Sequence, residues 1–336
     1  MYRRHIRTRQ TVGIITILLL SFLLQWTCRT AASWFSALDP AAVASFALYL
    51  QTGVIPAQEA ESDTKARTVP TAQPAQTASK ALPQPVTLTF TEQEAQTISV
   101  AGACTYTYDK AALLQQPLAA DFHTEGPQVL IVHTHTTESY TPEAGQNYTE
   151  LTHARTLDEN YNMIRVGQQV AAVLEANGIG VVHETTVNDY PDYNGAYDRM
   201  KTIIEENLAR YPSIQMVLDI HRDAAADENG DPLALTADYN GARYAQLMLV
   251  VGTDEGGLSH PNWQQNLSTA LKLQALLERT HPGLCRNLNL RQERFNQNQT
   301  PCSLLIEFGT DGNTLSQALH SADALGSALS QLILSS

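Results

Sequence analysis

The sequence predicts an α/β fold in which a mostly parallel, twisted sheet is covered by helices on both faces. Short apolar segments of strand length alternate with longer segments whose apolar residues recur at helical spacing. Such alternation is typical of parallel sheets, whose crossover helices cover both faces. It runs from Pro127 to Ser336, about 210 residues, which suits a single domain.

The expected elements follow one another in a regular order. Val166, Val170 and Val173 lie at helical spacing in a segment that stops at Asn177-Gly178, a good helix C-terminus. The expected strands are 128–132, 179–184, 214–220, 242–252 and 303–309. The expected helices are 160–178, 197–208, 263–277 and 313–334.

The N-terminus predicts a membrane anchor. Residues 1–10 carry four arginines, and residues 11–27 form an uncharged apolar segment just long enough to span a bilayer. Since the arginines precede this segment, the N-terminus is expected in the cytoplasm and the remainder outside the cell membrane. A cleaved signal peptide with a small-residue site near Ala32 is the alternative. Both interpretations export the remaining chain.

Three segments separate this anchor from the α/β domain. Residues 28–54 are an apolar juxtamembrane segment. Residues 55–85 are rich in Pro, Ala, Thr, Gln and Ser, and they are expected to form a flexible, disordered linker. Residues 86–126 are an ordered lead-in, and "VTLTFT" at its start alternates like a strand.

Charge and cysteine content exclude some classes of function. The formal net charge is -13, which argues against nucleic acid as the main partner. Cys104, Cys285 and Cys302 lie in the exported part, where one disulfide bond or three reduced thiols are equally compatible with the sequence. No Cys-x-x-Cys pair exists, so a cysteine zinc site is not expected.

Reactive residues gather where three of the predicted strands end. The first strand ends in His133 and His135, the third carries Asp219, His221 and Asp223, and the last contains Glu307. In open α/β sheets, ligands bind beyond the carboxyl ends of the strands. The sequence therefore predicts a metal site or an acid–base site at this edge of the sheet.

The residue types favour zinc and hydrolysis. Catalytic zinc usually has three His, Asp or Glu ligands and keeps one position open for water. Histidines from two strands would supply two ligands, and Asp158 or Glu159 could supply the third. Glu307, flanked by apolar residues, would remain as the general base. His-Glu-x-x-His and Gly-x-Ser-x-Gly, the signatures of other hydrolases, are absent.

Four strings in this domain resemble the stage II sporulation protein P (SpoIIP) family of membrane-anchored cell-wall hydrolases. They are "GPQVLIVHTHTTESY", "NYNMIRVGQQVAAVLEANGI", "DIHRDA" and "IEFGT". The resemblance covers residues 127 to the C-terminus. It implies a relation to the zinc-dependent N-acetylmuramoyl-L-alanine amidases of type 3, and hence an amidase-like catalytic domain.

The resemblance also implies roles for individual residues. His221 corresponds to one zinc ligand and Glu307 to the catalytic glutamate. His135 is preferred as the other histidine ligand, which leaves His133 as a catalytic or substrate group, although the two could exchange roles. The spacing before the Asn162-Met163 pair selects Asp158 as the carboxylate ligand.

Two acidic residues remain as alternatives to that aspartate. Glu159 is its neighbour, and Glu138 is otherwise expected to bind substrate. Arg222, with Arg199 as a second candidate, is expected to bind the carboxylates of anionic stem peptides.

The implied reaction is hydrolysis of the amide between N-acetylmuramic acid and L-alanine, with cleavage of peptide cross-links as a second activity of the family. The implied partners are a lytic transglycosylase, SpoIID, and a membrane protein, SpoIIM, during engulfment of the forespore. The implied location is the mother-cell membrane, with the catalytic domain facing the intermembrane space. A non-catalytic wall-binding module that recruits a hydrolase is the alternative from a different functional class.

Overall fold

The computed structural model describes residues 88–336. The basic segment 1–10, the expected anchor 11–27, the juxtamembrane segment 28–54 and the linker 55–85 lie outside this part. Within residues 88–336, no helix is both long enough and apolar enough to cross a membrane.

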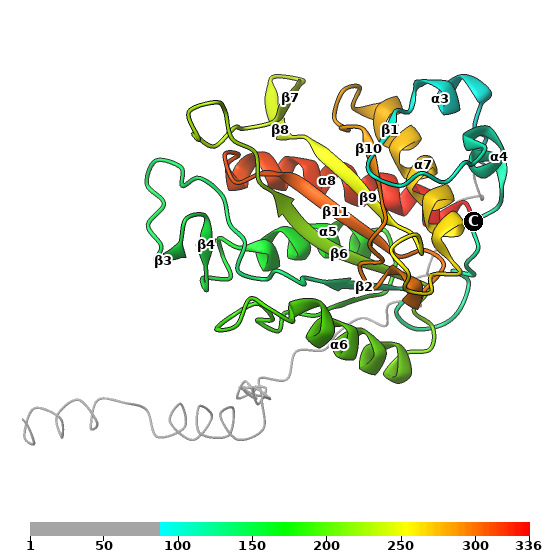
Figure 1. The fold of residues 1–336 in the computed structure, drawn as a ribbon, viewed down its shortest axis with the longest axis horizontal. Coiled ribbons are helices and arrows are strands. Elements are labelled where there is room, and N and C mark those ends of the chain that lie inside the picture. Colours follow the sequence, from blue (N-terminus) through cyan, green and yellow to red (C-terminus); the bar gives the residue numbers. More distant parts are fainter. Residues whose placement is uncertain (1–87) are drawn as a thin grey trace, which may run out of the picture. The chain divides into compact units, whose positions relative to one another are not determined.

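A seven-stranded sheet forms the centre of the molecule, with the strand order β1-β10-β9-β11-β6-β2-β5 (Figure 1). Every neighbouring pair is parallel except β11 and β9, which are antiparallel. The mostly parallel sheet predicted from the sequence is therefore confirmed. Its strands are β1 (Val100–Ala101), β2 (Val129–Val132), β5 (Val181–His183), β6 (Met216–Asp223), β9 (Leu247–Gly252), β10 (Leu288–Arg291) and β11 (Leu304–Thr310).

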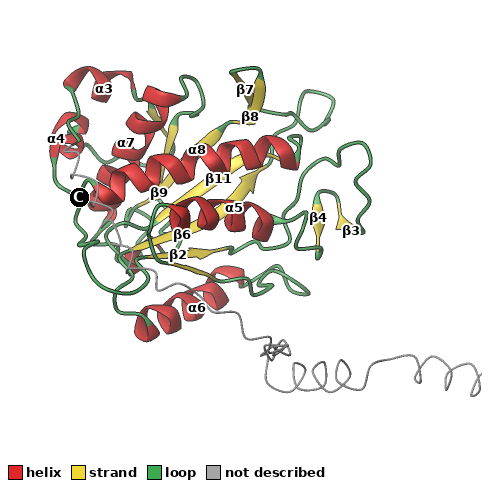
Figure 2. Cartoon of the chain, turned by 180° about the vertical axis from the view of Figure 1, so that it is seen from behind, coloured by secondary structure: helices red, strands yellow, loops and turns green. Residues whose placement is uncertain are grey.

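Helices cover both faces, but unequally. Figure 2 shows α5 and α8 lying across one face, to which α7 also contributes, whereas α6 packs on the other face near β2. The helices are α3 (Glu92–Thr97), α4 (Lys110–Gln115), α5 (Met163–Ala176), α6 (Ala196–Arg210), α7 (Trp263–Thr280) and α8 (Leu315–Leu334), with the short η1 (Gln297–Gln299). Two hairpins extend from this core: β3 (Glu150–Thr152) with β4 (Arg155–Thr156), and β7 (Thr236–Tyr239) with β8 (Ala242–Ala245).

The ends of α5 follow from its sequence. The Asn162 side chain accepts a hydrogen bond from the Ile164 N–H and caps the first turn. The helix stops before Asn177, and Gly178 adopts a left-handed conformation with φ of 82° that glycine tolerates best. The predicted stop at Asn177-Gly178 is thus confirmed.

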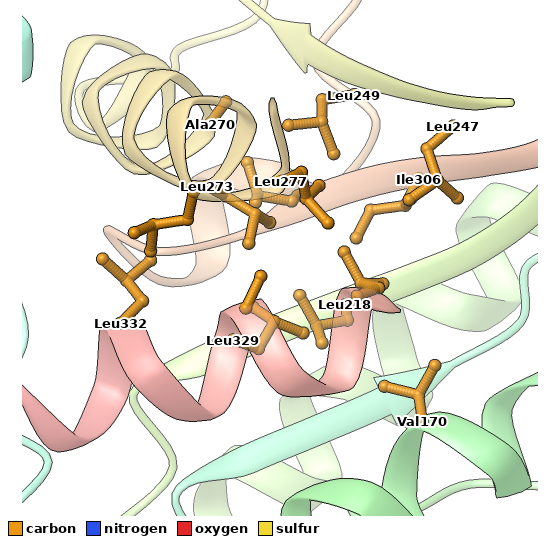
Figure 3. Packing of buried hydrophobic residues seen from close by; sticks show 14 of the residues in the cluster. Val170, Leu218, Leu247, Leu249, Ala270, Leu273, Leu277, Ile306, Leu329 and Leu332 are labelled. Atoms are coloured by element: carbon orange, nitrogen blue, oxygen red, sulfur yellow. The ribbon is translucent and has the colours of Figure 1, made fainter. Parts of the chain in front are cut away.

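Strand alternation divides the side chains between the two faces. In β6, Leu218 and Ile220 belong to the large core formed with α5, α7 and α8, part of which is shown in Figure 3. Val217 belongs instead to the smaller cluster under α6. Since successive side chains point to opposite faces, Asp219 and His221 lie on the α6 face with Val217.

Two predicted strands differ from the structure. Residues 88–90 form no regular strand, and Thr91 instead caps α3 through a capping box with Glu94. The single strand expected over 242–252 is two strands interrupted at Gln246. The first, β8, pairs with β7 in a hairpin, while the second, β9, enters the central sheet. Continuous apolar character does not reveal this change of partner.

The lead-in residues belong to the same compact unit as the α/β domain. β1 pairs with β10 at the edge of the sheet, and α4 packs against α7. The Leu113 carbonyl accepts hydrogen bonds from the Ser268 hydroxyl (2.7 Å) and the Lys272 ammonium (3.0 Å). The compact unit therefore includes residues on both sides of the boundary expected at residue 127.

The three cysteines expected in the exported part are free thiols in this structure. Cys302 is buried, while Cys104 and Cys285 are partly buried.

Candidate active site

His221 and Glu307 lie side by side on neighbouring strands. In the parallel pairing of β6 with β11, the two residues are directly in register. Residues in register point to the same face of a sheet, and for this pair it is the α6 face. Strand pairing therefore places an imidazole beside a carboxyl group, as the sequence predicted.

Glu307 has the surroundings of a group that can exchange a proton near neutral pH. Its Oε2 is buried and has no hydrogen-bond partner among residues 88–336. Burial raises the pKa of Glu307 to about 8, although the nearby His221 opposes the shift. A carboxyl group with such a pKa is suited to general acid–base catalysis.

His135 reaches the same site because the first strand ends before it. β2 stops at Val132, and the chain turns so that the Glu138 N–H donates to the His135 carbonyl (3.2 Å). The His135 ring stacks on Tyr193, with 4.5 Å between centroids, and stands nearly perpendicular to the His221 ring at 5.3 Å. The structure thus brings together His135, His221 and Glu307.

Glu138 is the carboxylate that completes this cluster. Its Oε2 is 3.6 Å from the His221 Nδ1 and accepts a hydrogen bond from the Arg222 N–H (3.2 Å). Burial alone would raise the pKa of Glu138, but His221 lowers it to about 2. Arg155 pairs with the other oxygen at 3.3 Å.

Asp219 supports His221 from the opposite side. One of its oxygens is 2.8 Å from the His221 Nε2, although the ring N–H is not aligned with it. The Thr134 N–H (2.8 Å) and hydroxyl (2.6 Å) both donate to this carboxylate and fix it. Burial opposes protonation of His221, yet Asp219 and then Glu138 raise its pKa well above the ordinary value.

Asp189 is a second buried carboxylate, and it lies beside His135. The Thr137 N–H (3.0 Å) and hydroxyl (2.8 Å) donate to its carboxylate, which lies 3.9 Å from the His135 Nδ1. Arg155 also pairs with it. The sequence gives no signal for Asp189, Arg155 or Tyr193, because each reaches the site from a loop or hairpin without a local motif.

The threonines of "HTHTTE" therefore have a structural explanation. Thr134 and Thr137 each hold a buried carboxylate that faces one of the two site histidines.

His133 lies on the other face of the sheet. Its ring fits against Gly167 of α5, where a Cβ would lie 2.6 Å from the ring. Its Nε2 is 2.8 Å from the His183 Nε2, so one of the two rings donates to the other. This position argues against the catalytic role expected for His133, because the sheet separates it from His221 and Glu307.

Asp158 does not join the cluster through any contact in the described part of the chain. Its carboxylate accepts hydrogen bonds from the Asn160 N–H (3.0 Å) and side-chain amide (2.9 Å), in the turn that leads to α5. Glu159 is exposed in the same turn. Among the three carboxylates considered from the sequence, the contacts favour Glu138.

The two arginines expected to bind substrate are engaged with the backbone. The Arg222 guanidinium donates to the carbonyls of Ser139 (2.9 Å) and Ala154 (2.7 Å) and is only 8% exposed. The Arg199 guanidinium donates to carbonyls of the loop before α6, including that of Asn188. These contacts support roles in holding loops in place.

The donors present fit zinc in kind. The His221 Nδ1 and Glu138 Oε2 are 3.6 Å apart. Two ligands of a tetrahedral zinc ion, each about 2.0–2.1 Å from the metal, are about 3.4 Å apart. The His135 Nδ1 is buried without a hydrogen-bond partner and lies 3.9 Å from Asp189, while its Nε2 is 3.2 Å from the Tyr193 hydroxyl. In the described residues, no group of three or more His, Cys, Asp or Glu side chains is arranged so that it could hold a metal ion.

Comparison with known families gives one match that covers most of the chain. A family model described as Stage II sporulation protein P (SpoIIP) matches residues 49–330. The "Stage II sporulation protein P" of Bacillus subtilis (strain 168) is 30% identical over 215 residues, which are 61% of this chain and 50% of that protein. The matched region thus spans half the length of this curated relative.

Solved structures with a similar arrangement include two bacterial amidases. The N-acetylmuramoyl-L-alanine amidase AmiC2 of Nostoc punctiforme is 15% identical, with a TM-score of 0.36, over 63% of this chain and 97% of that chain. The CwlD amidase from Clostridioides difficile, solved in complex with the GerS lipoprotein, is 16% identical, with a TM-score of 0.32, over 62% of this chain and 92% of that chain. At these scores the likeness carries no conclusion about activity.

Proposed function

This chain belongs to the stage II sporulation protein P family, and from this premise we propose that it is a zinc-dependent peptidoglycan hydrolase. We propose that it cleaves the amide bond between N-acetylmuramic acid and L-alanine. The observation that carries the proposal is the pairing of Glu307 with His221 on adjacent strands, beside His135 and Glu138. Peptide binding alone would not need a proton-exchanging carboxyl group at this position.

Each residue of the cluster would have its own role. His135, His221 and Glu138 would hold zinc, with Asp158 as the less favoured carboxylate. Zinc, when bound, supplies Lewis-acid activation of the amide carbonyl and of water. A cation at this place would lower the pKa of Glu307 from about 8 toward 7. It would attract the ionised carboxylate, as a charged His221 already does. Glu307 would then accept a proton from the attacking water and deliver it to the leaving amine.

The family and the sequence of the first 87 residues support a proposal for the wider setting. We propose a single membrane anchor at residues 11–27, a catalytic domain outside the cell membrane, and a role in forespore engulfment with SpoIID and SpoIIM. Cleavage of stem-peptide cross-links is a second proposed activity.

Digestion of purified peptidoglycan by the full chain tests the reaction. We expect release of stem peptides whose L-alanine carries a free amino terminus, and we expect a chelator to abolish this release. Products with cut cross-links would instead indicate a peptidase. If the wild-type chain with added zinc releases nothing, while His221→Ala binds peptidoglycan as well as wild type, the alternative of a non-catalytic wall-binding module is correct.

A further inference from the structure

A groove leads away from Glu307 across the half of the sheet that α6 does not cover. It begins in a cavity of about 210 Å³ that is lined by Glu307, Tyr197, Arg291 and other side chains. A second cavity of about 430 Å³ continues toward β1, and the two share Met248, Arg286 and Asn289. These shared side chains come from β9, from β10 and from the residues just before β10, so the groove crosses the strands from β11 toward the edge of the sheet.

The two arginines of this groove differ from the other arginines near the site. Arg286 donates from Nη1 to Asp223 (2.7 Å), and Arg291 donates from Nε to Glu293 (3.1 Å). Within residues 88–336, no other side-chain hydrogen bond of either guanidinium is present. By contrast, Arg155 directs donors to two carboxylates, and Arg222 directs donors to two backbone carbonyls.

Arg291 is also the most exposed of these four arginines. Its side chain is 39% exposed and that of Arg286 is 25% exposed, close to the 21% of Arg155, while Arg222 as a whole is 8% exposed. Because a guanidinium carries five N–H donors in a planar fork, each groove arginine can bind a carboxylate while it keeps its present partner.

We propose that this groove binds the peptide part of the substrate, and that Arg286 and Arg291 recognise carboxylates of an anionic stem peptide. The inference rests on the proposed hydrolase function. Arg286 and Arg291 take the place of Arg222 and Arg199 as the proposed substrate-binding residues. The donors of Arg222 and Arg199 are engaged with the backbone. The cleaved amide lies at Glu307, and the peptide extends from it over β9 and β10.

The experiment compares two muropeptides that differ only in their carboxyl groups, one with free carboxylates along the stem and one with these groups amidated. Hydrolysis by the full chain is measured for wild type, Arg286→Ala, Arg291→Ala and Arg291→Lys. Arg243→Ala serves as a matched control, because Arg243 also forms an exposed pair with an aspartate, Asp238, but on the β7–β8 hairpin.

We expect the wild type to prefer the free carboxylates. Removal of one charge-assisted contact should reduce kcat/KM for that substrate by roughly 10–100-fold, mainly through KM, and should reduce the preference over the amidated substrate. Arg291→Lys should recover part of the loss, and Arg243→Ala should match the wild type.

Binding of the same two ligands to Glu307→Gln separates this inference from the proposed function. If the wild type hydrolyses neither ligand but Glu307→Gln binds the carboxylate form better, the groove inference stands and the hydrolase proposal fails. If hydrolysis occurs and Arg286→Ala and Arg291→Ala keep the wild-type preference, the groove inference is overturned.

Discussion

The two faces of the central sheet hold buried histidines in different surroundings. On the α5 face, burial lowers the pKa of His133 to about 3 and that of His183 to about 4, so both rings are held neutral. On the α6 face, His221 is as deeply buried, yet Asp219 and Glu138 raise its pKa well above the ordinary value. Burial also lowers the pKa of His135, although Glu138 opposes the shift, so the neighbouring carboxylates set His221 apart from the other buried histidines.

His133 and His135 belong to one short motif but lie on opposite sides of the sheet. His133 directly follows β2 and continues its alternation, so it points to the α5 face. The chain then leaves the strand, and the turn at His135 carries that ring to the α6 face, against Tyr193 and His221.

The largest effect is expected for Glu307→Gln, which removes the proton-exchanging group of the α6 face. Hydrolysis of peptidoglycan should fall by roughly 10²–10⁴-fold, the usual contribution of a general acid–base residue. Bound zinc should stay at the wild-type level, as measured by metal analysis of the purified chain. Glu159→Gln, a change in an exposed turn, is the control and should leave both values unchanged. Equal activity of Glu307→Gln and wild type would contradict the assignment.

The choice of carboxylate ligand can be decided by zinc content. Glu138→Ala removes the oxygen 3.6 Å from the His221 Nδ1, so we expect a large loss of zinc affinity together with the loss of activity. Asp158→Ala should retain zinc, because that carboxylate contacts only its own turn in the described structure. Competition with a chromogenic chelator measures both affinities. The opposite order would restore Asp158 as the ligand.

Gly167→Ala tests the α5 face without touching the site. The new Cβ would lie 2.6 Å from the His133 ring and 2.7 Å from the His183 Nε2, so overpacking should lower the free energy of unfolding by about 1–3 kcal/mol. Urea denaturation measures this loss. Activity per folded molecule should remain close to wild type.

A second variant identifies the source of that strain. In a His133→Ala background the ring is absent, so most of the cost of Gly167→Ala should disappear. If Gly167→Ala abolishes activity while the fold remains intact, the α5 face does contribute to the reaction.

The smallest expected effect is a difference in pH dependence between His221 and the His133–His183 pair in the zinc-free chain. The unfolded chain protonates His133 and His183 near pH 6.5, but the folded chain binds these protons only near pH 3 and pH 4. The free energy of unfolding contributed by this pair therefore falls as the pH falls below about 6.5. His221 has the opposite sign, since its raised pKa contributes stability that is lost as the pH rises through the folded value.

His183→Gln isolates the contribution of the α5 face. The amide can still donate to His133 but does not titrate, so the loss of stability between about pH 6.5 and pH 4.5 should be smaller than in wild type. His153→Gln, which changes an exposed histidine, is the control and should follow the wild-type curve. An unchanged slope in His183→Gln would show that the pair does not titrate as described.

Much of the fold could be predicted because its signals are local. The apolar spacing of α5 and its Asn177-Gly178 stop, and the apolar strands β2, β6 and β11, all depend on residues that are neighbours in the sequence. The break at Gln246 and the pairing of β1 with β10 depend on partners far along the chain, so no local pattern indicated them.

The sequence by itself determined that His135, His221 and Glu307 belong to one edge of the sheet, because strand ends in an α/β fold meet there. Only the tertiary structure decided that His133 lies on the opposite face, that Glu138 and not Asp158 contacts His221, and that Asp189 faces His135. The physical reason is that the positions of the strands along the chain follow from short-range patterns, whereas the direction of a side chain beyond the last strand residue depends on the turn that follows. That turn is held by the contacts of Thr134 and Thr137 with distant carboxylates.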